Sequence, residues 1–324
     1  MKLYTKIASS ALFTLALLPV NIYAKNEAGQ NHDYRTFHIN KCVQYGNISD
    51  SYNSDLTIYV AGNQFMAMEE LIHDFQSKNP DIKKIYLETI PPGQILKGQI
   101  LKQGFINGIK TAQNPDLFAS VNLGHLKKLK AKNIMDDYII YTHNKLELMV
   151  AKGNPKNIKG PQDLVNKSLV KSLPNPLTEG IFKFYGSAML KKLGIYEEVT
   201  ANKQCKGCWA IKGETFFTQR HHRETPYLIE NGKADVGIVW ATEVEHAKKE
   251  GRELEGVEIS NAYNMGDKVG YAIGILKTGK HPYNASRYLA YLTSSSAQNI
   301  YASYGFTKAT NEDLTLKAIP QTTR

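Results

Sequence analysis

The chain has 324 residues, a formal net charge of +10, and 42% hydrophobic and 22% charged residues. This length suits two α/β units better than one minimal domain, and the composition is that of a folded globular protein rather than a disordered one. Its basic residues are scattered instead of gathered in a patch, so nucleic acid is not an expected partner.

The first 24 residues differ from the rest. Lys2 and Lys6 give a basic start, Ile7–Val20 is almost entirely apolar, and Ala24 is a small residue suited to cleavage. This pattern predicts a secretory signal peptide, because the apolar run is shorter than the roughly 20 residues that a spanning helix needs. Cleavage would remove two lysines and no acidic residue, which changes the charge from +10 to +8. We expect a periplasmic protein.

The region after this segment contains three cysteines, Cys42, Cys205 and Cys208. An oxidising compartment favours disulfides, but an odd number leaves the pairing open. The spacing of Cys205 and Cys208 fits a redox pair, half of a metal site or a structural staple. We favour the staple, because no second C-x-x-C completes a zinc site and Trp209 stands where c-type haem attachment needs His.

Residues 25–54 are polar and are predicted to be loosely held. Strands and helices then alternate, with Phe65–Phe75 at helical spacing and Asn79-Pro80 ending that helix. Residues 103–114 are interpreted as an inserted loop or hairpin. Strands are predicted at residues 56–60, 85–87, 116–119 and 146–150, beginning at 169–170, and at 236–240 and 271–276.

The alternation runs once, stops near residue 150 and starts again, while the last strand and helices belong with the first half. This order predicts an α/β fold with two lobes, each a mixed, mainly parallel sheet flanked by helices, and a ligand cleft between them. The expected bounds are 1–24 for the signal peptide, 25–54 for the N-terminal segment, 55–145 with 265–310 for lobe I, 146–264 for lobe II and 311–324 for a tail.

Ligands of open α/β sheets bind beyond the carboxyl ends of the strands, where free amides of helix starts can hold an anion. Asn63, Thr178 and Thr242 stand at such ends and either contact a ligand or cap a helix. The strand ends that enter helices here are Gly62-Asn63, Pro92-Gly93, Thr178-Glu179 and Thr242-Glu243.

Charged and imidazole side chains extend this candidate site. His221, His222 and Arg223 are suited to gripping an anion or, through one imidazole, a metal ion. Carboxylates at the same place favour a cation instead, or stabilise helix N-termini. The alternative metal set is Glu88, Glu179, His221 and Glu243.

The sequence contains neither a G-x-S-x-G elbow nor a P-loop, and no spacing of His, Asp and Ser singles out a triad. We therefore expect neither an enzyme nor a resident cofactor.

Several segments, in order, resemble the molybdate-binding group of type II periplasmic solute-binding proteins. The first strand, its glycine turn and the strand that leaves the first lobe all match that pattern. The ordered set is more specific than any one motif. It comprises residues 56–62, 114–120, 148–155, 232–240, 271–276, 281–282 and 304–306.

The resemblance implies a Venus-flytrap receptor, monomeric, that delivers an oxyanion to an ABC permease of the inner membrane. The family's ligand contacts map onto Gly62, Asn63, Pro92, Gly93, Asn175, Thr178, Trp240 and Thr242. This chain has Gly-Asn and Pro-Pro-Gly where the family has turns that contain Ser, so the identity of the small anion stays open. A metal ion or chelate is the alternative ligand, and a thiol-redox or colonisation protein is the alternative of another class.

Overall fold

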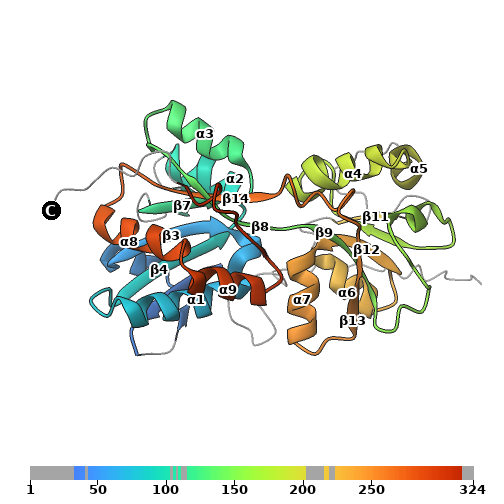
Figure 1. Ribbon diagram of the computed structural model, residues 1–324, viewed down its shortest axis with the longest axis horizontal. Helices are drawn as coiled ribbons and strands as arrows, with labels where there is room; N and C mark the ends of the chain where they lie inside the picture. The colour runs from blue at the N-terminus through green and yellow to red at the C-terminus, as the bar shows by residue number, and fades with distance from the viewer. Residues whose placement is uncertain are drawn as a thin grey trace, which may run out of the picture.

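The computed structural model describes residues 33–40, 43–102, 105–106, 109–110, 115–201, 215–218 and 223–315 (Figure 1). The predicted signal peptide, the three cysteines, His221 and His222 lie outside these ranges. Within them, no helix is both long enough and apolar enough to cross a bilayer.

Lobe I is built on an eight-stranded sheet with the order β15-β8-β14-β7-β3-β4-β1-β2. The central strand β3 runs parallel to β4 and β7, and β14 lies antiparallel between β7 and β8. The strands are β1 (Tyr34–His38), β2 (Gln44–Tyr45), β3 (Leu56–Ala61), β4 (Lys84–Ile90), β7 (Leu117–Ser120), β8 (Ile139–His143), β14 (Gly270–Ile275) and β15 (Thr307–Lys308).

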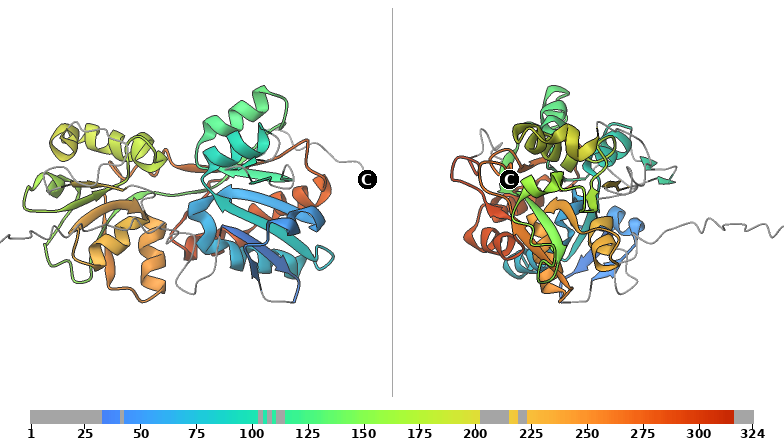
Figure 2. Two further views of the ribbon diagram at one scale, coloured as in Figure 1. Left: turned by 180° about the vertical axis from the view of Figure 1, so that it is seen from behind. Right: turned by 90° about the vertical axis from the view of Figure 1, so that its right-hand side faces the viewer.

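Helices cover both faces of this sheet (Figure 2). On one face lie α1 (Phe65–Lys78), α8 (Pro282–Leu292) and α9 (Ser295–Ser303), and on the other α2 (Pro92–Gln94), η3 (Ile95–Ile100) and α3 (Leu123–Ala131). The helical spacing of Leu71, Ile72 and Phe75 puts all three in the core, as the sequence pattern predicts.

Lobe II is built on a five-stranded sheet with the order β11-β10-β12-β9-β13. Its strands are β9 (Leu146–Ala151), β10 (Lys171–Leu173), β11 (Thr215–Phe217), β12 (Val236–Trp240) and β13 (Leu254–Glu258). Its helices are η4 (Pro161–Val165), η5 (Ile181–Gly186), α4 (Ser187–Lys192), α5 (Tyr196–Thr200), α6 (Glu224–Glu230) and α7 (Ala241–Lys249). The mixed α/β fold agrees with the predicted fold class. A separate hairpin, β5 (Phe105–Ile106) with β6 (Ile109–Lys110), lies where an inserted hairpin was predicted.

The N-terminal segment differs from the expectation that it is loosely held. β1 pairs antiparallel with β4 over five residues, and Asp50 of η1 (Ile48–Asn53) accepts a hydrogen bond from Thr36 (2.9 Å). Arg35 and Phe37 are buried. The sequence signal is weak because buried polar and apolar residues follow one another in β1, so no alternation marks the strand.

The start of the predicted C-terminal tail is also attached to lobe I. Asp313 accepts a hydrogen bond from the Nε2 side of His143 (2.9 Å), and its carbonyl oxygen accepts from Ile140 N (3.2 Å). The described part of this segment therefore packs along β8.

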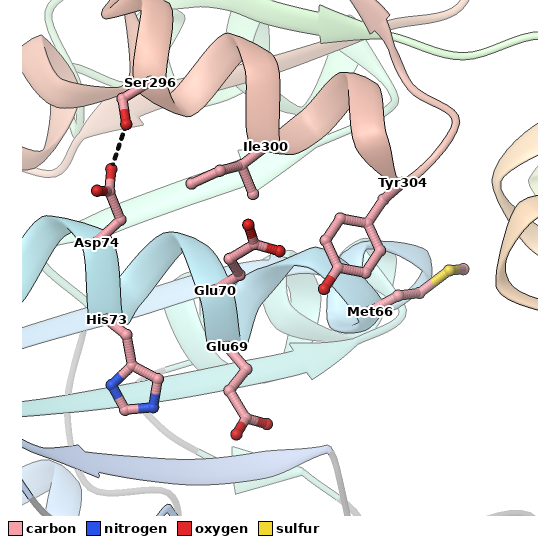
Figure 3. Close-up of a pocket in the computed structure, with 8 residues that line it drawn as sticks. All are labelled: Met66, Glu69, Glu70, His73, Asp74, Ser296, Ile300 and Tyr304. Atoms are coloured by element: carbon pink, nitrogen blue, oxygen red, sulfur yellow. Dashed lines mark hydrogen bonds between the residues drawn. The ribbon is translucent and has the colours of Figure 1, made fainter. Parts of the chain in front are cut away.

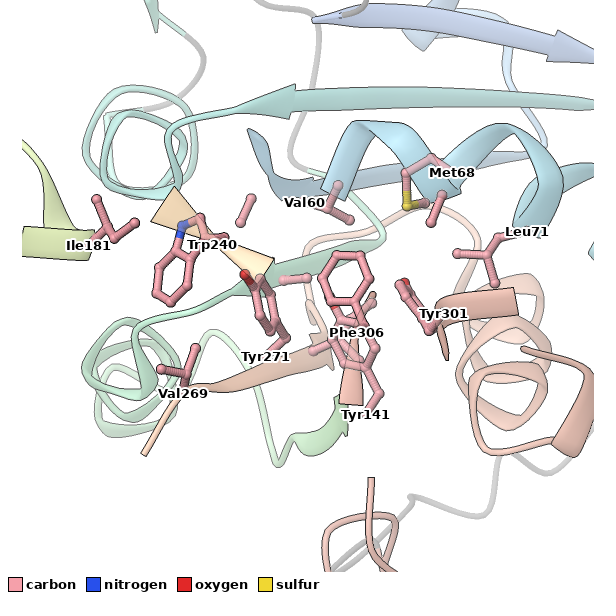
Figure 4. Packing of buried hydrophobic residues seen from close by; sticks show 14 of the residues in the cluster. Val60, Met68, Leu71, Tyr141, Ile181, Trp240, Val269, Tyr271, Tyr301 and Phe306 are labelled. Carbon is pink, nitrogen blue, oxygen red and sulfur yellow. The ribbon is translucent and has the colours of Figure 1, made fainter. Parts of the chain in front are cut away.

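The chain passes from lobe I to lobe II between β8 and β9, and returns between β13 and β14 (Figure 1). The two passages lie side by side, since Asn144 N donates to Val269 O (3.2 Å) and Leu146 N to Asn264 O (2.8 Å). One apolar cluster continues across them, with Val60 and Tyr301 of lobe I and Ile181 and Trp240 of lobe II (Figure 4). The lobes are therefore packed against each other.

Candidate functional site

The two sheets turn the carboxyl ends of their parallel strands toward the boundary between the lobes. In lobe I, β3 enters η2 (Gly62–Gln64), β4 enters α2, and β7 leads into α3. In lobe II, β10 precedes η5, β11 precedes α6, and β12 enters α7. This is the edge at which open α/β sheets bind ligands.

A buried hydrogen-bond network joins the two lobes at the crossings. Asn63 Nδ2 donates to the Tyr271 hydroxyl. Asn144 Nδ2 lies 3.2 Å from the same hydroxyl and 3.1 Å from Thr242 Oγ1. Asn63 and Thr242 are thus brought together through two residues that the sequence did not single out. Neither caps a helix with its side chain.

Arg223 extends from lobe II onto the first turn of lobe I. Its Nη2 donates to the carbonyl oxygen of Gly62, and its guanidinium carbon lies 4.5 Å from the centre of the Phe65 ring. Burial lowers the pKa of Arg223, while the charges of Glu243 and Asp33 oppose that shift. A partly buried guanidinium that contacts both lobes can donate hydrogen bonds at their boundary.

Glu179 fastens two loops of lobe II to each other. Its Oε1 accepts hydrogen bonds from Asn175 N (2.9 Å) and from the Thr218 hydroxyl. Asn175 Oδ1 accepts from Leu177 N (2.9 Å), so its side chain shapes the same turn. Thr178 is exposed. The structure thus brings Asn175 and Glu179 together and leaves Thr178 at the surface.

Glu88 lies on the face of the lobe I sheet that η3 covers, fully buried among tyrosines. Gln99 Nε2 donates to Glu88 Oε1. Burial, more than the nearby charge of Asp33, raises the pKa of Glu88 to about 8. The neighbouring tyrosines Tyr34, Tyr59 and Tyr86 carry raised pKa values for the same reason.

The three carboxylates of the alternative metal set have separate hydrogen-bond partners. Glu88 bonds Gln99, Glu179 bonds Thr218, and Glu243 Oε2 accepts from Trp240 N (3.2 Å). No group of three His, Cys, Asp or Glu residues suited to a metal ion is present in the part of the chain that the structure describes. His221 lies outside that part.

Three residues that the sequence analysis missed stand beside the predicted loop Pro92-Gly93. Ser120 ends β7, Asn122 caps α3, and His125 follows one turn later. Ser120 Oγ lies 2.9 Å from His125 Nδ1, and a Cβ on Gly93 would lie 4.0 Å from His125 Cε1. Only the cap spacing of Asn122 is visible in the sequence.

Aromatic residues make a second bridge between the lobes. The Tyr185 hydroxyl of η5 donates to the carbonyl oxygen of Val121 in lobe I (3.2 Å). The Tyr185 ring also meets the Trp240 ring edge to face at 5.6 Å. Trp240 is therefore core at the lobe boundary, and Tyr185 is the residue that reaches across.

A surface groove of about 680 Å³ lies elsewhere, between α1 and α9 (Figure 3). One of its acids, Asp74, is engaged within lobe I, where it accepts hydrogen bonds from Ser296 (2.7 Å) and Tyr291 (2.8 Å). The lining residues are Met66, Glu69, Glu70, His73, Asp74, Ser296, Ile300 and Tyr304. This groove is not formed by the strand ends described above.

Two α/β lobes with two crossings, whose strand ends meet at one boundary, define a type II periplasmic-binding-protein-like fold. The chain belongs to the bacterial extracellular solute-binding protein family, whose sequence pattern matches residues 56–307. These bounds span both sheets from β3 to the first residue of β15.

A curated relative and two solved structures show the same similarity. The putative ABC transporter substrate-binding lipoprotein YvgL of Bacillus subtilis is 24% identical over 255 residues, covering 78% of this chain and 86% of the relative. The substrate binding domain of a putative molybdenum ABC transporter from Clostridium difficile has a TM-score of 0.61 at 18% identity, over 79% of this chain and 99% of that one. The periplasmic molybdate-binding protein of Azotobacter vinelandii has a TM-score of 0.59 at 17% identity, over 79% and 100%.

Proposed function

We propose that this chain is the exported receptor of an ABC importer and that it captures a small oxyanion for the permease. The observation that carries the proposal is Arg223, a partly buried guanidinium of lobe II that touches Gly62 and Phe65 of lobe I. A partly buried cation at the lobe boundary, beside several helix starts, suits an anion that bridges the two halves. The names of the molybdenum and molybdate relatives support the same ligand class.

Binding would proceed by hinge motion about the two crossings. An anion that contacts both lobes binds the closed form more tightly than the open one, and so shifts the population toward it. The permease would then distinguish loaded from empty receptor by shape. Neither chemistry on the ligand nor a resident cofactor is part of this role.

Removal of residues 1–24 and a periplasmic location complete the proposal. The mature receptor is proposed to act as a monomer. Its partners are the anion and the inner-membrane permease.

Calorimetry on protein freed of ligand by unfolding and refolding tests the ligand class. Molybdate, tungstate, sulfate and phosphate would be titrated in parallel with Zn²⁺, Mn²⁺ and Fe³⁺. We expect at least one oxyanion to bind, and Arg223→Gln to weaken it about tenfold or more, because it removes a charge-assisted donor. Heat with a metal ion and none with any oxyanion would overturn the ligand class.

Arg252→Gln is the matched control. Arg252 forms an ion pair with Glu230 within lobe II, through Nε at 2.9 Å and through Nη2. The substitution removes the same charge without touching the lobe boundary. Equal weakening by both variants would mean that general charge, not the placement of Arg223, attracts the anion.

A further inference from the structure

We infer that Asn122 and His125 form a subsite in lobe I that donates two neutral hydrogen bonds to one oxygen of the ligand. The inference rests on the proposed function and deepens it. It concerns side chains outside the motifs quoted in the sequence analysis. The argument starts from Ser120, the buried last residue of β7.

The hydroxyl of Ser120 fixes which ring nitrogen of His125 carries the proton. Ser120 is completely buried, and its Oγ accepts a hydrogen bond from Asn122 N (3.0 Å). Its single proton is left for His125 Nδ1, 2.9 Å away. If Nδ1 donated instead, the buried hydroxyl proton would have no acceptor within the described residues, which is costly. The neutral imidazole therefore carries its hydrogen on Nε2.

The orientation of the Asn122 amide is fixed as well. Asn122 Oδ1 accepts from Gly124 N (2.9 Å), as an N-cap oxygen does. Its other terminal atom must then be the NH2 group. That nitrogen lies 3.5 Å from His125 Nε2. Two donors at this separation cannot satisfy each other, and one acceptor placed between them satisfies both.

The pair lies where a ligand between the lobes would reach it. Val121, the residue before Asn122, is bound by Tyr185 of lobe II, and His125 lies beside Gly93. Both side chains are partly exposed. Burial, followed by the charges of Lys97 and Lys128, lowers the pKa of His125. The ring is thus kept neutral and remains a donor through Nε2 alone.

The ligand oxygen that fits is an acceptor without a proton of its own, on a sulfate-like, phosphoryl or carboxylate group. Asn122→Asp provides a sharp test. Aspartate keeps the N-cap oxygen for Gly124 and replaces the donor with a charged acceptor. We expect oxyanion affinity, measured by calorimetry with sulfate and molybdate, to fall about tenfold or more. Asn122→Ser keeps a cap but lacks the amide, and should weaken binding without adding a charge.

His125 supplies the second arm. His125→Leu should lose binding, and His125→Gln should recover part of it, because the Gln amide reaches the position of Nε2. Asn166→Asp is the control, because Asn166 Oδ1 also accepts a hydrogen bond from a backbone amide, that of Ser168 (2.9 Å). Asn166 precedes β10, at the amino-terminal end of that strand and away from the strand ends that face the lobe boundary. All variants should keep the melting temperature of the parent within a few degrees.

The outcomes separate the two proposals. An unmodified protein that binds no oxyanion removes the proposed function and this inference with it. An unmodified protein that binds, with Asn122→Asp and His125→Leu within twofold of it, overturns the subsite alone. Loss in Asn166→Asp equal to that in Asn122→Asp would also overturn it, because charge would then explain the effect.

Discussion

Arg223 of lobe II donates a hydrogen bond to the carbonyl oxygen of Gly62 in lobe I. The same guanidinium lies over Phe65, whose ring also meets His246 of α7 edge to face at 5.3 Å. The first turn of α1 is therefore held by lobe II from two directions. The arrangement of the lobes in this structure thus has stabilising contacts of its own.

Arg223→Lys should loosen this contact while keeping the charge. A lysine cannot stack its charge flat on the Phe65 ring, and the loss of this interaction costs about 1–2 kcal/mol. The loss shifts the ratio of closed to open protein toward the open form by roughly 5- to 30-fold. Small-angle scattering of ligand-free protein should show a larger radius of gyration. Arg252→Lys, within lobe II, should leave the scattering curve unchanged, and identical curves for all three proteins would contradict the role given to Arg223.

Tyr271→Phe should destabilise the protein by about 1–3 kcal/mol, because it leaves the buried amides of Asn63 and Asn144 without their shared acceptor. Tyr288→Phe is the comparison. The Tyr288 hydroxyl is buried and makes no hydrogen bond within the described ranges, so its removal should be neutral or slightly stabilising. Urea denaturation of both variants measures the difference. Similar losses in both would show that the network contributes nothing beyond packing.

Glu88 should make stability fall as the pH rises. Its folded-state pKa of about 8 exceeds the ordinary 4.5, so between these values the folded chain keeps a proton that the unfolded chain has lost. Its contribution to the free energy of unfolding is fully present below about pH 4.5. Between that pH and about pH 8 the free energy of unfolding decreases by roughly 1.4 kcal/mol per pH unit. Glu88→Gln mimics the protonated form and should flatten this slope in denaturation measured from pH 5 to 8. Glu258→Gln, at the surface of β13, should not, and parallel profiles for all three proteins would refute the assignment.

Gly305→Ala should weaken the contact between lobe I and helix α7 of lobe II. Gly305 has a φ of +82°, and an added Cβ would lie 3.0 Å from Glu245 Cβ and 3.3 Å from Thr242 Cα in α7. Gly251 has a similar φ of +66° with nothing within 4 Å of such a Cβ. Gly251→Ala therefore measures the backbone cost alone, about 1 kcal/mol. The loss of thermal stability in Gly305→Ala beyond that in Gly251→Ala measures the cost of the contact with α7. Equal losses in the two variants would mean that α7 moves aside at no measurable cost.

The positions of six main strands along the chain could be predicted from the sequence because β3, β4, β7, β9, β12 and β14 are short, mainly apolar runs. β1, β8, β11 and β13 were not predicted. β1 mixes buried charged and apolar residues, and β13 has partly exposed positions with no clear alternation. Helix starts were less certain. Thr225 precedes Pro226, a pattern typical of an N-cap, but its hydroxyl bonds Ser172 of β10 (2.8 Å) and α6 begins at Glu224.

Site residues were harder to predict than strands. When both faces of a strand are buried, the sequence pattern does not show toward which face of the sheet a side chain points. Glu88 follows this rule: every residue from Ile85 to Ile90 is buried, so nothing in the pattern says that Glu88 points toward η3. Ser120 and His125 are related only through the geometry of one helix turn. Strand ends, by contrast, are read directly from the chain, which is why Gly62 and Asn63 were identified.

Lobe II occupies one continuous stretch of the chain, and lobe I does not. β14 lies between β7 and β8, so the first sheet stays divided until the polypeptide beyond residue 269 is available. Lobe II has all five of its strands by residue 258. As the chain is synthesised, lobe II can thus complete its sheet before the last strands of lobe I are available. A chain shortened by about fifty residues at its C-terminus would therefore lose the fold of lobe I, although it still contains the first strands of that lobe. It would keep every strand of lobe II.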